Sequence, residues 1–97
     1  MKIRPTETAQ YTIDYLEEYC DRKSFYKKCH AVDMDGGFSY LVSYDTIVCS
    51  ITSDGRFVRH WPRYSATTLR HVSAFRRRAG LPAIGKKEWE SLTVERF

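Results

Sequence analysis

The feature that most constrains the fold is a helix whose two ends are both marked in the sequence. Ser65 is a favourable N-cap, and residues 66–79 follow it without a helix breaker. Gly80 stands where a Schellman ending needs a left-handed residue, and Pro82 prevents continuation of the helix. An apolar stripe at helical spacing predicts the buried face of this helix: Leu69, Val72, Phe75 and Ala79.

A β-rich region precedes this helix and predicts the sheet that it packs on. Residues 25–34 favour a strand, and Asp35-Gly36-Gly37 is a turn signal. Residues 38–51 are the longest β-like run, but their apolar alternation changes parity at 43–45. Such a change indicates a bulge or a break at that point. A further strand is predicted over 56–61.

The loop Ser53-Asp54-Gly55 predicts a hairpin between the last two of these strands. A three-residue loop with its glycine in the left-handed region pairs Ile51 with Phe57 and Ile47 with Trp61. This register gathers the large apolar side chains on one face, so we prefer it to a two-residue loop.

The N-terminal part of the chain has the periodicity of a helix over residues 8–22. Its expected core-facing stripe is Ala9, Ile13, Leu16 and Cys20. A second line at four-residue spacing consists of three tyrosines: Tyr11, Tyr15 and Tyr19. Such a line is either the solvated edge of a buried stripe, which we favour, or a secondary ridge that binds a partner.

A short helix over 85–93, anchored by Trp89 and Leu92, is expected to complete the chain. The predicted order is one helix, about three strands and two helices, an α+β fold with a small antiparallel sheet packed against helices. The chain has 97 residues, which suits a single domain over 1–97. The sequence shows no apolar run near the roughly 20 residues of a membrane span, and its N-terminus lacks an apolar signal region. We therefore expect a cytoplasmic protein with no membrane partner.

The residues that most often carry chemistry do not form a recognisable motif. Cys20, Cys29 and Cys49 are odd in number and widely spaced, which favours buried, reduced thiols over disulfides. No Cys/His pair has zinc-finger spacing, and no Walker loop, GxSxG, HExxH or GxGxxG motif occurs. We therefore expect no enzymatic activity, no metal and no cofactor.

Basic residues are concentrated in the second half of the chain. Residues 1–48 hold six Lys/Arg against eight Asp/Glu, whereas residues 49–97 hold ten against four, and no acid lies between Asp54 and Glu88. Charge asymmetry of this kind indicates a polyanionic partner, and the alternative is a solubilising surface that binds nothing. The candidate binding residues of this basic hairpin–helix face are Arg56, Arg59, Arg63, Arg70, Arg77 and Arg78.

We expect these arginines to be exposed, with Arg70 and Arg77 seven residues apart on the outer face of the helix. The small residues Ser73 and Ala74 between them would allow a phosphate or carboxylate to approach closely. His71 either joins Arg70 in binding phosphate or packs against the sheet.

A resemblance emerges from several of these segments taken together. Residues 43–48 (SY-x-T-x-V), the turn at 53–55 and residues 64–75 (YS-x-TT-x-RH-x-x-x-F), with Gly80, resemble a pattern in small uncharacterised bacteriophage and mobile-element proteins. Residues 22–26 resemble the start of that pattern, so the likeness covers about residues 22–81. It implies a mobile-element origin but no reaction.

Together these observations lead to two main hypotheses of function. The first is an inhibitor of a host defence nuclease or nucleoprotein in the bacterial cytoplasm, of the anti-CRISPR type, that uses the basic face. The second is a nucleic-acid-binding accessory or regulatory protein of the mobile element. A structural phage component is a third hypothesis. The sequence leaves open the choice between RNA, DNA and protein as partner, and the oligomeric state.

Overall fold

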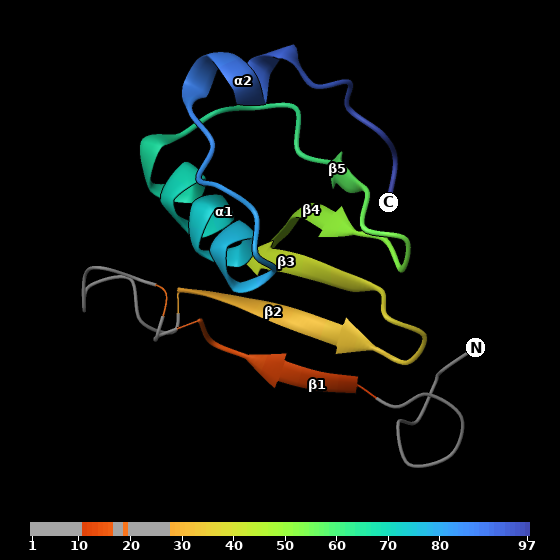
Figure 1. Cartoon of the computed structure of the whole chain (residues 1–97). Coiled ribbons are helices and arrows are strands. Elements are labelled where there is room, and N and C mark those ends of the chain that lie inside the picture. The colour runs from red at the N-terminus through yellow and green to blue at the C-terminus, as the bar shows by residue number, and fades with distance from the viewer. Residues whose placement is uncertain (1–10, 17–18, 20–27) are drawn as a thin grey trace.

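The computed structural model of the chain describes residues 11–16, 19 and 28–97 (Figure 1). Their elements are β1 (Tyr11–Asp14), β2 (Cys29–Met34), β3 (Ser39–Ser43), β4 (Thr46–Ile51), β5 (Phe57–Arg59), α1 (Ala66–Arg78) and α2 (Lys86–Ser91). The five strands form one antiparallel sheet in chain order. Helix α1 lies along one face of this sheet, and α2 lies at the β5 end (Figure 1). The predicted α+β class is confirmed, with more strands than expected.

The predicted helix over 8–22 is wrong where the structure describes it, because Tyr11–Asp14 is strand β1. These residues pair with β2, and Ile13 faces Val32 with 46% of its surface exposed. Leu16 is buried as expected, but it follows the strand and has a left-handed φ of 61°. The β-branched side chains of β1 suit a pleated strand, and pairing with β2 overrides the helical periodicity. Two members of the expected stripe lie outside the described residues: Ala9 and Cys20.

The change of parity at 43–45 corresponds to a tight turn between two strands. Tyr44 and Asp45 form this turn, and Tyr44 has a left-handed φ of 57°. The pairing of β3 with β4 also shifts register between Leu41 and Val42. The single long run of the sequence is therefore two strands, and the break is confirmed where it was predicted. Residues 25–27 of the expected preceding strand lie outside the described part of the chain.

The β4–β5 hairpin has the predicted register. Ile51 pairs with Phe57, and Gly55 has a left-handed φ of 92°. The Gly55 N–H donates to the Thr52 carbonyl at 2.9 Å. Because a residue with a side chain is strained at this φ, Gly55 fixes the loop length and with it the register.

The end of this hairpin differs from the prediction. Strand β5 stops at Arg59, and the N–H groups of His60 and Trp61 both donate to the Val48 carbonyl, at 2.8 and 3.1 Å. Two residues on one side thus share one acceptor on the other, which ends the regular pairing. Ile47 and Trp61 therefore do not form the expected cross-strand pair.

Helix α1 has both of its predicted ends. The Ser65 hydroxyl accepts a hydrogen bond from the Thr68 N–H at 3.0 Å. At the other end Gly80 is left-handed, and the Leu81 N–H donates to the Arg76 carbonyl at 2.8 Å. This is the Schellman arrangement expected from the sequence.

The core lies between α1 and the covered face of the sheet. Its buried apolar side chains include Cys29, Leu41, Cys49, Val72, Phe75 and Trp89. Trp89 comes from α2, as predicted, and covers the β5 end of the core. The expected burial of the cysteines is confirmed for Cys29 and Cys49, and burial raises the pKa of the Cys49 thiol.

We predict that Phe75→Ala lowers the free energy of unfolding by about 3–5 kcal/mol, because it leaves a cavity under α1. Denaturant unfolding followed by circular dichroism measures the change. Lys87→Ala, on an exposed position of α2, is the control and should change stability by less than about 0.5 kcal/mol. Equal stability of the two variants would contradict this packing.

Candidate functional site

Arg59 was expected on the basic face, and this expectation is wrong. The side chain is buried, with 6% of its surface exposed. Its Nε donates to the Trp61 carbonyl at 2.9 Å, and its Nη1 donates to the carbonyls of Trp89 and Leu92, each at 3.1 Å. The guanidinium also lies 4.8 Å from the centre of the Trp89 ring. Arg59 therefore connects β5 to α2, and it is not available to a ligand.

Arg76 is a second buried arginine, and no feature of the sequence distinguishes it from its neighbours Arg77 and Arg78. Its Nε donates to the Pro82 carbonyl at 2.8 Å, and its guanidinium lies 4.6 Å from the centre of the Phe57 ring. The segment after α1 folds back along the helix and covers this side chain.

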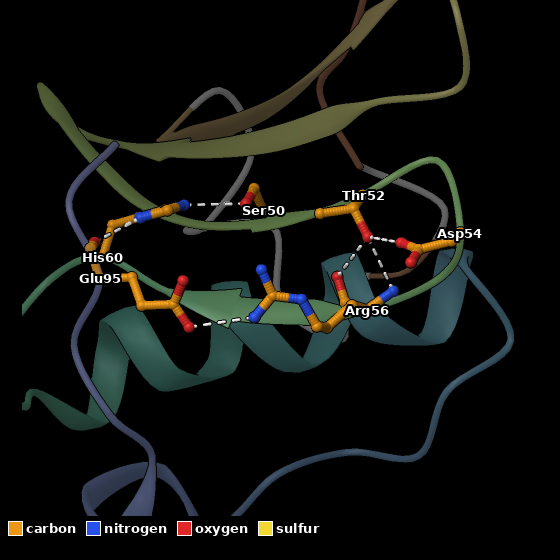
Figure 2. A network of polar contacts seen from close by, with 6 residues as sticks. All are labelled: Ser50, Thr52, Asp54, Arg56, His60 and Glu95. Atoms are coloured by element: carbon orange, nitrogen blue, oxygen red, sulfur yellow. Dashed lines mark hydrogen bonds and ion pairs between the residues drawn. The ribbon is translucent and has the colours of Figure 1, made fainter.

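Two further candidates form ion pairs within the protein. Arg78 Nε lies 2.9 Å from Asp14, and the same guanidinium pairs with Asp33. Arg56 lies 3.0 Å from Glu95 (Figure 2). The charges of Arg78 and Arg56 are thus balanced by carboxylates of the same chain.

Asp33 is held in its ionised form by its neighbours. Burial by itself raises the pKa of this carboxyl, but hydrogen bonds from Ser39 and Arg78 outweigh burial and lower the pKa below its usual value. A pocket of about 190 Å³ adjoins this group at the end of α1. Because the one guanidinium of Arg78 faces the carboxylates of both Asp33 and Asp14, this group offers no unbalanced positive charge to an anionic ligand.

The expectation that Ser73 and Ala74 leave open space between Arg70 and Arg77 is also wrong. Ala74 is completely buried and Ser73 is nearly so. Arg77 is exposed but donates to the Tyr19 carbonyl at 2.6 Å. Both flanks of α1 are therefore covered, and Arg70 and Arg77 are left on a narrow outer strip of the helix.

The tyrosine ridge does not exist as a helical feature. Tyr15 is exposed and its ring contacts His30, whereas Tyr19 is partly buried against the core. The backbone of Tyr11 belongs to β1, and its side chain lies outside the described atoms. A four-residue spacing aligns side chains on a helix but not in an extended segment.

His71 packs against the sheet, which was one of the two interpretations left open. It is fully buried, and its Nδ1 lies 2.8 Å from the Ser43 hydroxyl, which in turn is 3.5 Å from the Thr68 hydroxyl. Burial lowers the pKa of His71. A phosphate on the surface cannot reach this ring.

Exposed basic side chains do gather where the two helices begin. Lys86 lies 5.0 Å from the centre of the Tyr64 ring, and the Trp89 indole N–H donates to the Arg63 carbonyl at 2.9 Å. These contacts place the start of α2 beside the segment that leads into α1. We call this region the helix-start surface and define it by exposed residues: Arg63, Tyr64, Lys86 and Lys87. Arg70 is exposed one turn into α1.

The electrostatics of the helix-start surface favour an anion. The first turn of α1 contains no acidic residue, and its Ser65 cap satisfies the Thr68 N–H. The N–H groups at a helix start carry the positive end of the helix dipole, which adds to the basic side chains. Glu88 in the first turn of α2 is the acidic residue closest along the chain to Lys86 and Lys87. Of the six candidate arginines, Arg63 belongs to this surface. Arg70 follows Arg63 by seven residues in the sequence.

The described residues give no sign of a metal site or of a membrane span. No group of three or more His, Cys, Asp or Glu side chains among them could hold a metal ion. None of the helices within the described ranges is long and apolar enough to cross a membrane.

Comparison with known proteins identifies a family for this chain. A model described as a family of unknown function (DUF8033) matches residues 14–91. No curated protein and no solved structure matches the chain. The family description names no activity, partner or source.

We predict that Arg59→Ala lowers the free energy of unfolding by about 2–4 kcal/mol, because three backbone carbonyls lose a charged donor. Arg59→Lys should recover only part of this loss, since an ammonium group lacks the forked geometry of guanidinium. Thermal and denaturant unfolding measure both. Arg63→Ala is the matched exposed control and should unfold like the wild type.

The burial of His71 predicts a specific pH dependence. Its pKa is lower in the folded chain than the ordinary 6.5, so the unfolded chain takes up the proton first as pH falls. Stability is therefore unaffected by this group above about pH 6.5, and below it declines by at most about 1.4 kcal/mol per pH unit until the folded pKa is reached. Unfolding curves of wild type and His71→Leu between pH 7.5 and 5 should show a steeper loss for wild type; parallel losses would contradict the assignment.

Proposed function

We propose that this chain, which belongs to the DUF8033 family of unknown function, is a non-enzymatic protein that binds the phosphate groups of a nucleic acid. The observation that carries the proposal is the helix-start surface. Exposed Arg63 lies just before α1, whose first turn contains no acid, and exposed Lys86 reaches the Tyr64 ring beside it. Phosphate is the anion that this combination of donors suits, because arginine, lysine and helix N–H groups are its usual partners.

The partners of the other arginines support the helix-start surface as the binding site. Arg56 and Arg78 are paired with carboxylates, and Arg59 is buried among carbonyls. Neutralising phosphates requires basic groups whose charge is not already balanced within the protein. On this argument the footprint is centred on Arg63 and Lys86, beside the start of α1.

Tyr64 adds a second type of contact to the same surface. Its ring is exposed, and Lys86 lies over it. Single-stranded nucleic acids commonly bind where basic residues follow the backbone and an aromatic ring stacks with a base. We therefore propose a single strand, rather than a duplex, as the preferred ligand.

We predict that the double variant Arg63→Glu/Lys86→Glu binds labelled single strands more weakly than wild type and with a smaller salt dependence. Each lost phosphate contact removes about 0.7 from the slope of log affinity against log salt, so the slope should flatten by roughly one to two units. Fluorescence anisotropy at several salt concentrations, with single strands and duplexes, measures both quantities.

The control for this experiment reverses the same number of charges elsewhere. Lys28→Glu/Arg96→Glu changes two exposed residues outside the helix-start surface. It should weaken binding only through net charge and keep the slope of the wild type. If the two double variants bind alike, the helix-start surface is not the site; if neither the wild type nor its variants bind nucleic acid, the proposed function is wrong.

A second candidate function is an inhibitor of a host defence complex in the bacterial cytoplasm. It rests on the resemblance to small mobile-element proteins and on the adjacent exposed Arg63 and Tyr64, residue types enriched at the energetic centres of protein interfaces. Pull-down from a bacterial lysate with and without nuclease separates the two functions. Retention of a defence protein after nuclease treatment, lost in Arg63→Glu/Lys86→Glu, favours this second candidate.

A further inference from the structure

Residues 94–97, which we call the C-terminal segment, meet the edge strand β5 at Val94 and Glu95 and end with Phe97 against Tyr40 of β3. Val94 forms a parallel bridge with Arg59 of β5, and the Glu95 N–H donates to the Arg59 carbonyl at 2.8 Å. In Figure 1 the chain descends from α2 past β5 to the C-terminus. Val94 and Glu95 therefore take the position that residues of an added strand would occupy beside β5.

Side chains hold the middle of this segment from two sides. Arg56 pairs with the Glu95 carboxylate at 3.0 Å, and His60 Nδ1 lies 2.7 Å from the Glu95 carbonyl (Figure 2). Because a carbonyl can only accept, Nδ1 carries the hydrogen, and in the neutral ring Nε2 then accepts from the Ser50 hydroxyl at 2.8 Å. The contact between Ser50 and His60 thus orients the donor towards the segment.

An aromatic cluster holds the end of the segment. The Phe97 ring centre lies 5.0 Å from that of Tyr40, 5.1 Å from that of His60 and 6.0 Å from that of Phe38. Tyr40 pairs in register with Val32 and Ser50, on the face of the sheet opposite the one that Leu41 presents to the core. Glu95 and Phe97 are two residues apart, as side chains on one face of a strand must be.

These contacts are specific but weak. Phe97 keeps 57% of its surface exposed and Val94 keeps 42%. The side chains of Arg56 and Glu95 are 59% and 43% exposed, and an ion pair in that setting adds little stability. The segment can therefore leave the sheet at low cost. When it leaves, the outer edge of β5 and the aromatic cluster lose their cover, a surface that readily accepts another chain.

We propose that the β5 edge, together with Arg56, His60, Tyr40 and Phe38, is a peptide-binding site. Its ligand is an extended peptide of a partner protein that carries an acidic residue two positions before an aromatic residue. The C-terminal segment occupies this site in cis and must be displaced by the ligand. The acid is required because Arg56 faces that position, and the aromatic residue because Phe38, Tyr40 and His60 receive it.

A peptide fits this site better than a nucleic acid for two reasons. The Arg59 carbonyl receives a backbone N–H, and His60 donates to a backbone carbonyl. These are the groups that alternate along an extended peptide, and Arg56 is the basic side chain that an acidic residue of such a peptide meets. The site shares no residue with the helix-start surface, and the proposal does not depend on nucleic-acid binding.

The test uses the chain of residues 1–97 and a labelled peptide with the sequence of residues 91–97, SLTVERF. In wild type the C-terminal segment competes at an effective concentration on the order of millimolar. Phe97→Ala weakens this competitor, so the peptide should bind that variant about tenfold more tightly than wild type. Phe97 is exposed, and a thermal melt like that of wild type verifies that the variant is folded.

Two matched changes test the chemistry of the ligand. The peptide with Phe97→Ala should lose binding, because nothing fills the aromatic cluster. A protein carrying Arg56→Glu and Phe97→Ala should bind the original peptide poorly and regain affinity for the peptide with Glu95→Lys. A structural role of Arg56 alone would not produce this exchange of preference.

Four results would overturn the proposal. One is equal peptide affinity of wild type and Phe97→Ala, and another is the absence of binding to either. The third is a wild-type dimer that forms with increasing concentration and is lost in Phe97→Ala, which would assign the site to a second copy of this chain. The fourth is displacement of the bound peptide by an oligonucleotide, since the site would then hold nucleic acid.

Discussion

The buried guanidinium of Arg59 is the interaction on which the second half of the molecule depends. It joins the end of β5 to the carbonyls of Trp89 and Leu92, at the end of α2. Its position over the Trp89 ring adds to the packing of α2 on the core. With α2 held there, Lys86 meets Tyr64, and the chain leaves α2 in the direction of the β5 edge. Both proposed surfaces therefore depend on one arginine whose guanidinium is buried.

Part of the charge asymmetry along the sequence is satisfied inside the protein. Asp14 and Asp33 come from the acidic first half, and both pair with Arg78 from the basic second half. Arg78 thus holds the end of α1 against β1 and β2. Charged pairs between distant segments specify which elements pack together, and they reduce the basic surface that remains for a partner. Among the residues that the structure describes, Arg63, Lys86 and Lys87 remain exposed at the start of the helices.

The two proposed surfaces differ in their physical basis. The helix-start surface relies on unbalanced charge and would lose affinity steeply with salt. The β5 edge relies on backbone hydrogen bonds and on the aromatic contacts of Phe97, and it should respond to salt much less. One chain could therefore hold a nucleic acid and a protein segment at the same time, through interactions that do not compete.

Short-range signals determined a large part of the fold. The Ser65 cap, the left-handed Gly80 and the left-handed Gly55 each act within a few residues, so the sequence alone predicted α1 and the β4–β5 register. The burial of Cys49 and the anchoring role of Trp89 were also expected from the sequence, and both residues are buried.

Long-range contacts decided the rest. Residues 8–22 have helical periodicity, yet pairing with β2 makes residues 11–14 a strand. Arg59 pairs with Cys49, as the register of the hairpin requires, but its burial needs the carbonyls of Trp89 and Leu92, about thirty residues away, to cover it. The candidate arginines likewise look equivalent in sequence, and only folding separates those that meet a carboxylate or a carbonyl from those that face solvent. A local pattern fixes backbone conformation, because caps and turns are satisfied by neighbours, whereas the availability of a charge depends on groups that only the tertiary structure brings near.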